Sequence, residues 1–150
     1  MPQSHTQILI HAIFSTKNRE PLILPPWRSR LFAYVAGIIN ESGGTTHLVN
    51  GTADHVHILL DLPRERSVSE MMRLAKTNSS KWIHEQFPAH RSFRWQNGYG
   101  AFSVSASAAD RVKTYIARQE EHHRRKTFQE EYISFLKKHG ISYDERYIWD

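Results

Sequence analysis

The order of strand-type and helix-type periodicity constrains the fold of this chain more than any other feature. Alternating apolar residues indicate a strand, whereas apolar residues that recur every three or four positions indicate a helix. The strand-type segments are residues 7–15, 45–50, 55–61 and 102–105, and the helix-type segments are residues 27–42, 68–87, 108–126 and 128–138. Strand, helix, strand, strand, helix, strand is the order of the ferredoxin-like or RRM-like split sandwich. We therefore predict an α+β fold with an antiparallel sheet and helices on one face.

Local signals at the ends of the segments agree with this order. Ser67 and Glu70 have the spacing of a capping box at the start of the second helix, and Ser107 is expected to cap the third. Residues 51–54 suit a hairpin between the second and third strands. The C-terminal helices then extend the same domain, and the second face of the sheet is expected to stay free for a ligand.

Length and apolar content limit the class of protein. A chain of 150 residues with 39% hydrophobic residues suits one compact domain, so residues 1–150 are predicted to form a single domain. The sequence has no apolar run near the roughly 20 residues that a membrane-spanning helix needs, and its start lacks the features of a secretion signal. We therefore expect a cytoplasmic protein with no membrane partner.

Two histidines, His55 and His57, share one face of the predicted strand 55–61, while the apolar residues between and after them point into the core. A pair with this spacing can bind one divalent cation through ring nitrogens. Because the chain has no cysteine, any metal site must use nitrogen and oxygen ligands. Surface or hydrogen-bonded histidines would give the same pattern, so the pair alone leaves both interpretations open.

Tyr115 and Gln119 lie one turn apart in the predicted helix 108–126, so their side chains share a face. The same positions also belong to an ordinary apolar stripe, and packing is the simpler interpretation of the tyrosine alone. The combination is more informative. A phenol that can attack a phosphodiester, an amide oxygen and two imidazoles are the parts of a metal-assisted phosphoryl transfer.

Positive charge is concentrated in two segments of a chain whose net charge is +5. Residues 64–96 hold seven basic and three acidic residues, and residues 111–126 hold six basic and two acidic residues. A polyanion is the natural partner of such segments, although two solvated helices would show the same excess. The candidate nucleic-acid contacts are Lys17, Arg19, Arg73, Lys76, Arg111 and Arg118.

Five motifs together resemble one known family. They are FSTKNREPLI, GTADHVHILLDLP, RWQNGYGAFSVS, YIARQEEHH and FQEEY, and they extend over nearly the whole chain. The chain resembles the HUH nucleases, named for histidine-hydrophobe-histidine, and specifically the single-tyrosine transposases of the simplest bacterial insertion sequences. The resemblance implies that His55, His57 and Gln119 hold Mg²⁺ or Mn²⁺ and that Tyr115 is the nucleophile.

The same resemblance implies a reaction and partners. The expected protein is an endonuclease and strand transferase that acts on single-stranded DNA with hairpin ends through a 5′-phosphotyrosine intermediate. It also implies a homodimer, in some members with the tyrosine helix completing the partner's histidine site. No nucleotide cofactor is expected, since the sequence has no G-x-x-x-x-G-K-[ST] loop.

Two other functions fit parts of the sequence. An RRM-like binder of single strands would stack bases on an aromatic sheet face, whereas the predicted face carries His55 and His57. A phosphoesterase with two H-x-[ST] motifs would match only His90-Arg91-Ser92. Among the remaining histidines, His122 and His123 are expected to face phosphate or cap a helix, and His11 is expected to be an ordinary polar sheet residue. The turn 95–99 is interpreted as a base-stacking platform or as part of the core.

Overall fold

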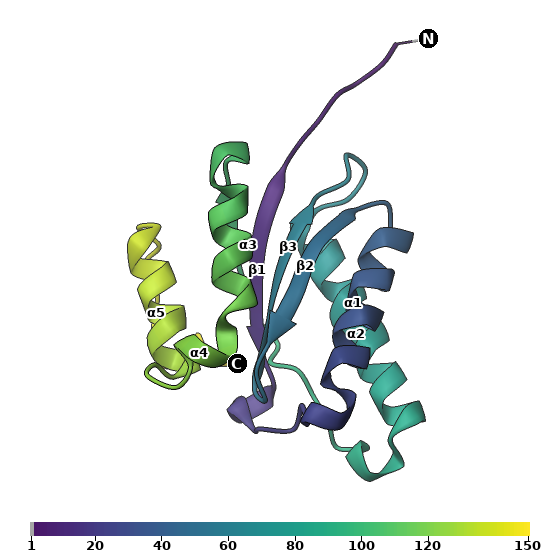
Figure 1. Ribbon diagram of the computed structural model, residues 1–150, viewed down its shortest axis with the longest axis vertical. Helices are drawn as coiled ribbons and strands as arrows, with labels where there is room; N and C mark the ends of the chain where they lie inside the picture. Colours follow the sequence, from purple (N-terminus) through teal and green to yellow (C-terminus); the bar gives the residue numbers. More distant parts are fainter. Residues whose placement is uncertain (1) are drawn as a thin grey trace.

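A computed structural model describes residues 2–150 and contains one four-stranded antiparallel sheet with the order β2-β3-β1-β4. The strands are β1 (Leu9–Ser15), β2 (Thr45–Gly51), β3 (His55–Asp61) and β4 (Gly100–Val104). Helices α1 (Pro25–Glu41) and α2 (Val68–Gln86) connect them and lie together on one face of the sheet (Figure 1). The predicted ferredoxin-like order and the α+β class are therefore confirmed.

The main core lies between the sheet and the pair α1 and α2. Val56, Ile58 and Leu60 of β3 point into it, together with Phe14 of β1 and Leu31 of α1. This is the alternation that period two predicts for β3, and it sends His55 and His57 to the opposite face. The first helix pair thus determines which face of the sheet remains for the histidines.

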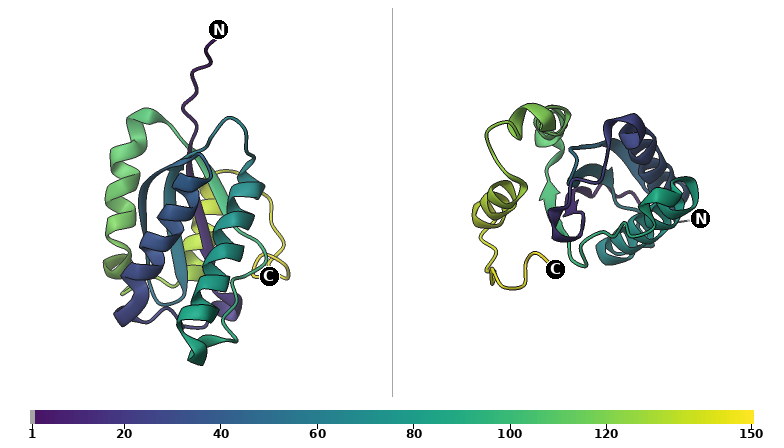
Figure 2. Two further views of the ribbon diagram at one scale, coloured as in Figure 1. Left: turned by 90° about the vertical axis from the view of Figure 1, so that its right-hand side faces the viewer. Right: turned by 90° about the horizontal axis from the view of Figure 1, so that it is seen from below.

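Helices from the C-terminal third cover that opposite face, so the molecule has three layers (Figure 2). These helices are α3 (Ala109–Ala117), α4 (Gln119–His122) and α5 (Phe128–Lys138). A second cluster joins Phe128, Tyr132 and Leu136 of α5 to Ile13 and Phe102 of the sheet. The expectation of a free sheet face is wrong, because α5 has its own apolar stripe and buries it there.

The predicted helix 108–126 is broken in two. It ends at Ala117, and Arg118 has non-helical angles of φ −102° and ψ 25° before α4 begins. Asn50 Nδ2 donates to the carbonyl oxygen of Ile116 at 2.8 Å, so β2 holds the end of α3. The predicted cap at Ser107 is also wrong, because this residue lies inside a short 3-10 turn, η3 (Ala106–Ala108), that precedes α3.

The predicted hairpin at residues 51–54 is present and fixes the start of β3. A Cβ atom on Gly51 would lie 2.1 Å from the carbonyl oxygen of His55, so only glycine fits this close approach. At the start of α2 the Ser67 hydroxyl accepts from the Glu70 backbone N–H at 3.1 Å, which is one half of the predicted capping box. The Glu70 carboxylate accepts from Arg66 at 3.2 Å in place of the Ser67 backbone. Two further 3-10 turns are η1 (Lys17–Arg19) and η2 (Pro88–His90). None of the helices within residues 2–150 is long and apolar enough to cross a membrane.

Candidate active site

His55 and His57 lie on β3 beneath the C-terminal helices. Neither side chain has any exposed surface. The prediction that the two rings share one sheet face is confirmed by the core position of Val56 between them. The expectation that this sheet face stays free for a ligand is wrong at the two histidines, because α5 closes over this part of the sheet.

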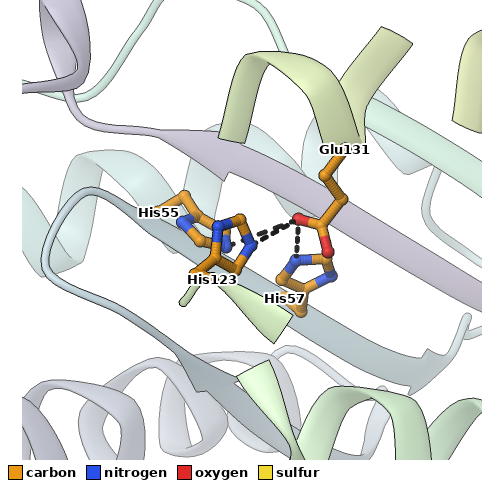
Figure 3. Close-up of side chains that lie close together, drawn as sticks. All are labelled: His55, His57, His123 and Glu131. Carbon is orange, nitrogen blue, oxygen red and sulfur yellow. Dashed lines mark hydrogen bonds and ion pairs between the residues drawn. The ribbon is translucent and has the colours of Figure 1, made fainter. Parts of the chain in front are cut away.

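The two histidines form a compact cluster with His123 and Glu131 (Figure 3). One nitrogen of each ring and one oxygen of Glu131 all lie within 4.8 Å of one another. Glu131 Oε1 is 2.9 Å from His57 Nε2, 3.0 Å from His123 Nε2 and 3.6 Å from His55 Nε2. Imidazole nitrogens and carboxylate oxygens are ligands of divalent cations, so this cluster can hold a metal ion.

Gln119 and Tyr115 meet the same cluster. Gln119 is fully buried, with Oε1 2.9 Å from His55 Nε2 and with Nε2 donating to Glu131 Oε2 at 3.2 Å. The Tyr115 hydroxyl donates a hydrogen bond to the same Glu131 oxygen. The structure thus brings all four predicted residues of the catalytic and metal sites together within one chain, despite the break after α3.

Outer contacts hold both histidine rings in place. Asp54 Oδ1 lies 2.7 Å from His55 Nδ1, and His11 Nε2 lies 2.8 Å from His57 Nδ1. Hydrogen bonds of this kind on the second ring nitrogen fix the tautomer and orientation of a metal-binding histidine. His11, expected to be an ordinary sheet residue, therefore supports the cluster.

Burial and the contacts around Glu131 set the charges in the cluster. Burial alone would raise the pKa of the Glu131 carboxyl, but hydrogen bonds from His123 and His57 hold it far below its ordinary range. Burial lowers the pKa of His57 to about 4, so this ring is neutral at pH 7. Burial, followed by the negative charge of Glu131, raises the pKa of Tyr115 above its ordinary value of 10.0. The cluster therefore holds an ionised carboxylate beside a protonated phenol.

Glu131 and His123 are absent from the predicted site. His123 was expected to face phosphate or cap a helix, and its ring instead joins the cluster. A signal for Glu131 exists in the sequence, because it lies three residues after Phe128 and one before Tyr132, on the apolar stripe of α5. A carboxylate in such a stripe must find buried partners, which is a reason to examine it.

The arrangement gives no support to the two alternative functions. The face that an RRM-like binder would use for stacking is covered by α3, α4 and α5. His90 of the single H-x-[ST] motif packs against Trp27 of α1. Helix α1 lies on the face of the sheet opposite to that of His55 (Figure 1). Trp95 of the turn 95–99 is buried in the main core, while Tyr99 packs partly buried against it.

Three of the predicted nucleic-acid contacts, Lys17, Arg73 and Lys76, line a hollow of about 510 Å³ between α2 and residues 94–99. The ammonium of Lys76 is already bound, because it donates to the carbonyl oxygens of Gln96 at 2.9 Å and Asn97 at 3.1 Å. Burial lowers the pKa of Lys76 to about 8. Lys76 therefore stabilises the turn 95–99, and its ammonium is less available to a phosphate.

The other three predicted contacts lie elsewhere. Arg19 stacks over Trp149, with its guanidinium carbon 5.5 Å from the ring centre, and Arg111 is exposed on α3. Arg118 lines a hollow of about 470 Å³ beside Tyr115. The remaining lining residues are Glu121, His122, Arg124, Arg125 and Lys126. The phenol thus borders a hollow in which four of the seven lining residues are basic.

A sequence profile described as IS200-like transposase matches residues 4–119. This range is well over half of the 150 residues and includes the whole sheet, Tyr115 and Gln119. The chain belongs to the IS200-like transposase family. His123 and Glu131 lie beyond the matched residues.

Curated relatives of this chain are the transposases for insertion sequence element IS200 of Salmonella typhimurium and Salmonella typhi. Each is 37% identical over an alignment of 73 residues, and the match covers 45% of this chain and 47% of the relative. The aligned part thus spans about half the length of the curated relatives.

Solved structures share the fold at lower identity. A protein of Deinococcus radiodurans R1 assigned as a transposase has a TM-score of 0.64 and 20% identity, covering 79% of this chain and 98% of that one. A REP-associated tyrosine transposase bound to a REP hairpin has a TM-score of 0.60 and 14% identity, covering 82% and 73%. These likenesses establish that the family fold extends over most of the chain.

Proposed function

We propose that this IS200-like transposase is a metal-dependent endonuclease and strand transferase that acts on single-stranded DNA and forms a 5′-phosphotyrosine through Tyr115. One observation carries the proposal. The Tyr115 hydroxyl and the Gln119 amide meet His55 and His57 at one buried cluster, although 58 positions separate Tyr115 from His57 in the sequence. This reaction requires a nucleophile close to the ligands of a divalent cation.

The residues present fit a divalent cation. His55 and His57 would hold it through their Nε2 atoms and Gln119 through Oε1, and the mixture of imidazole and oxygen ligands suits Mn²⁺ or Mg²⁺. When bound, such an ion polarises the phosphate and stabilises the departing oxygen. Asp54 and His11 keep the two rings oriented toward this point.

The covalent step exchanges one phosphate ester for another. The Tyr115 oxygen forms a bond to phosphorus while the bond from phosphorus to the 3′ oxygen breaks. The proton of the phenol leaves along its hydrogen bond to Glu131 Oε2, and the departing oxygen takes up one proton to become a free 3′-OH, so that no proton is gained or lost overall. The 3′-OH of a second strand can reverse the step, so strand joining needs no nucleotide cofactor.

The proposed substrate is single-stranded DNA with hairpin ends. The basic hollow beside Tyr115 supports a nucleic acid, because its arginines and lysine can neutralise phosphates close to the phenol. A structural neighbour bound to a REP hairpin supports a folded strand as the ligand. We also propose that residues 1–150 act as one catalytic domain.

The decisive experiment is incubation with single-stranded oligonucleotides of mixed sequence and Mn²⁺, followed by denaturing electrophoresis. A label at the 3′ end should migrate with the protein, because the downstream fragment keeps the 5′-phosphate that is bound to Tyr115. A label at the 5′ end should appear in a shortened free strand that a polymerase can extend from its 3′-OH. The opposite distribution of label would contradict the proposed polarity.

Salt dependence should report which basic residues touch phosphate. For single-stranded DNA, each neutralised phosphate contributes about 0.7 to the slope of log affinity against log salt. Arg73→Gln and Arg118→Gln should each make the slope shallower by about that amount, as measured by fluorescence anisotropy. Lys76→Gln should change it less, because carbonyl oxygens already bind that ammonium. Arg146→Gln, at an exposed pair with Asp144, is the control, and a parent slope near zero would contradict a phosphate interface.

We further propose that the protein works as a homodimer, since transposition must hold two DNA ends. One chain suffices to bring Tyr115 to its own cluster, so the dimer need not share tyrosines. Light scattering is expected to give twice the 17.5 kDa mass of the chain. A 17.5 kDa particle both with and without DNA would contradict this expectation.

A further inference from the structure

His55 makes polar contacts through both ring nitrogens. Asp54 Oδ1 lies 2.7 Å and Thr52 Oγ1 lies 3.0 Å from His55 Nδ1. On the cluster side, His55 Nε2 faces two oxygens, Gln119 Oε1 at 2.9 Å and Glu131 Oε1 at 3.6 Å.

The contacts of the Gln119 amide favour the orientation in which its oxygen faces His55. Its Nε2 donates to Glu131 Oε2 at 3.2 Å. Turning the amide over would place a hydrogen toward His55, but it would set the amide oxygen against that carboxylate. One ring nitrogen of His55 and the oxygens of Gln119 and Glu131 therefore converge in the buried cluster, as the ligands of a cation do.

We propose that Glu131 and His123 are ligands of the cation, in addition to His55, His57 and Gln119, and that the second oxygen of Glu131 positions the Tyr115 hydroxyl. This inference rests on the proposed function and deepens it. The added ligands come from the segment after residue 119, beyond the part of the chain that the family profile matches. The C-terminal segment would thus complete the metal site as well as cover it.

The spacing of the ligand atoms fits one coordination shell. Two atoms that are each about 2.1 Å from a cation lie about 3.0 Å apart at a right angle and about 3.4 Å apart at a tetrahedral angle. The four measured separations are 2.9 Å for His55 to Gln119, and 2.9, 3.0 and 3.6 Å from Glu131 Oε1 to His57, His123 and His55. These atoms already have the separations of neighbours around one ion.

Glu131 changes the charge of the ligand set. Imidazole and amide ligands are neutral, so His55, His57 and Gln119 provide no charge to balance a divalent ion. A carboxylate supplies one negative charge, and the number of charged ligands is one of the factors that set affinity for hard cations. Glu131 is also the link between the ion and the nucleophile, because Oε1 faces the histidines and Oε2 accepts from Tyr115.

The test is calorimetric titration of the full chain with Mn²⁺ and no DNA. Glu131→Gln keeps the size of the side chain and removes its charge, and His123→Asn removes one ring nitrogen from a side chain that is only 11% exposed. Each is expected to weaken Mn²⁺ binding by about tenfold or more. Glu85→Gln removes the same charge from an exposed residue of α2, and His47→Asn removes an exposed ring, so these matched controls should bind within about twofold of the parent.

Far-ultraviolet circular dichroism of every variant, recorded without metal, separates lost ligands from lost folding. If Glu131→Gln unfolds, the folded His123→Asn variant still tests the added ligands. Binding as tight as the parent's in both variants, with His57→Gln still weakened, would overturn this inference and leave the proposed function standing. Mn²⁺ affinity that is unchanged in all three variants would overturn both, because no part of the cluster would then hold the ion.

Discussion

Replacing Tyr115 with phenylalanine is expected to abolish the covalent adduct and the cleavage of single-stranded DNA, while DNA and Mn²⁺ still bind. The substitution removes one oxygen and keeps the ring that stacks on His122 with centroids 4.5 Å apart. Without that oxygen no ester to phosphorus can form. Denaturing electrophoresis with the 3′-labelled strand measures the result.

A packing role for Tyr115 would give a different outcome. The phenylalanine variant would then lose only the hydrogen bond to the Glu131 carboxylate, at a cost of about 1.5–3 kcal/mol of unfolding free energy, and cleavage would persist. Tyr132→Phe is the matched control, because Tyr132 is a buried tyrosine that follows Glu131 on α5, and this variant should remain active. Mass spectrometry adds an independent check. A nucleotide found on Tyr34, Tyr99, Tyr132, Tyr143 or Tyr147 would identify another nucleophile.

Much of this site was accessible from local patterns. The order of strands and helices gave the sheet, and period two on β3 gave a shared face to His55 and His57. The spacing of Tyr115 and Gln119 predicted neighbouring side chains, and they remain neighbours even though the helix ends at Ala117. The shared face of the two histidines and the proximity of Tyr115 to Gln119 each depend on residues a few positions apart, where backbone geometry alone decides which side chains are neighbours.

The features that were missed depend on long-range contacts. The third layer forms because the stripe of α5 meets Ile13 and Phe102, which lie far away in the chain. The break at Arg118 reflects Asn50 of β2, which binds the last carbonyl groups of α3. His11 and His57 are 46 positions apart in the sequence, and only the register of β1 and β3 brings them together. A pattern within one segment contains none of these pairings.

Burial of the histidines has consequences for stability that an exposed pair would not have. His57 contacts Glu131 at 2.9 Å, and His55 contacts Asp54 at 2.7 Å and Gln119 at 2.9 Å. Removing both rings would leave cavities under α5 and would take from a buried carboxylate one of its hydrogen-bond donors. Both effects reduce the free energy of unfolding, even in protein without metal.

The double variant His55→Ala/His57→Ala is therefore expected to lose Mn²⁺ binding and also about 3–5 kcal/mol of unfolding free energy. Urea denaturation in the presence of a chelator measures the second effect without a contribution from bound ion. The control is His5→Ala/His47→Ala, which removes two exposed rings and should stay within about 0.5 kcal/mol of the parent.

His57→Gln keeps a donor for Glu131, so it should remain folded and bind Mn²⁺ more weakly, which separates the metal effect from the loss of stability. A double variant as stable as the parent would contradict the burial of the cluster, and undiminished Mn²⁺ binding by the folded His57→Gln variant would remove His57 from the ligands.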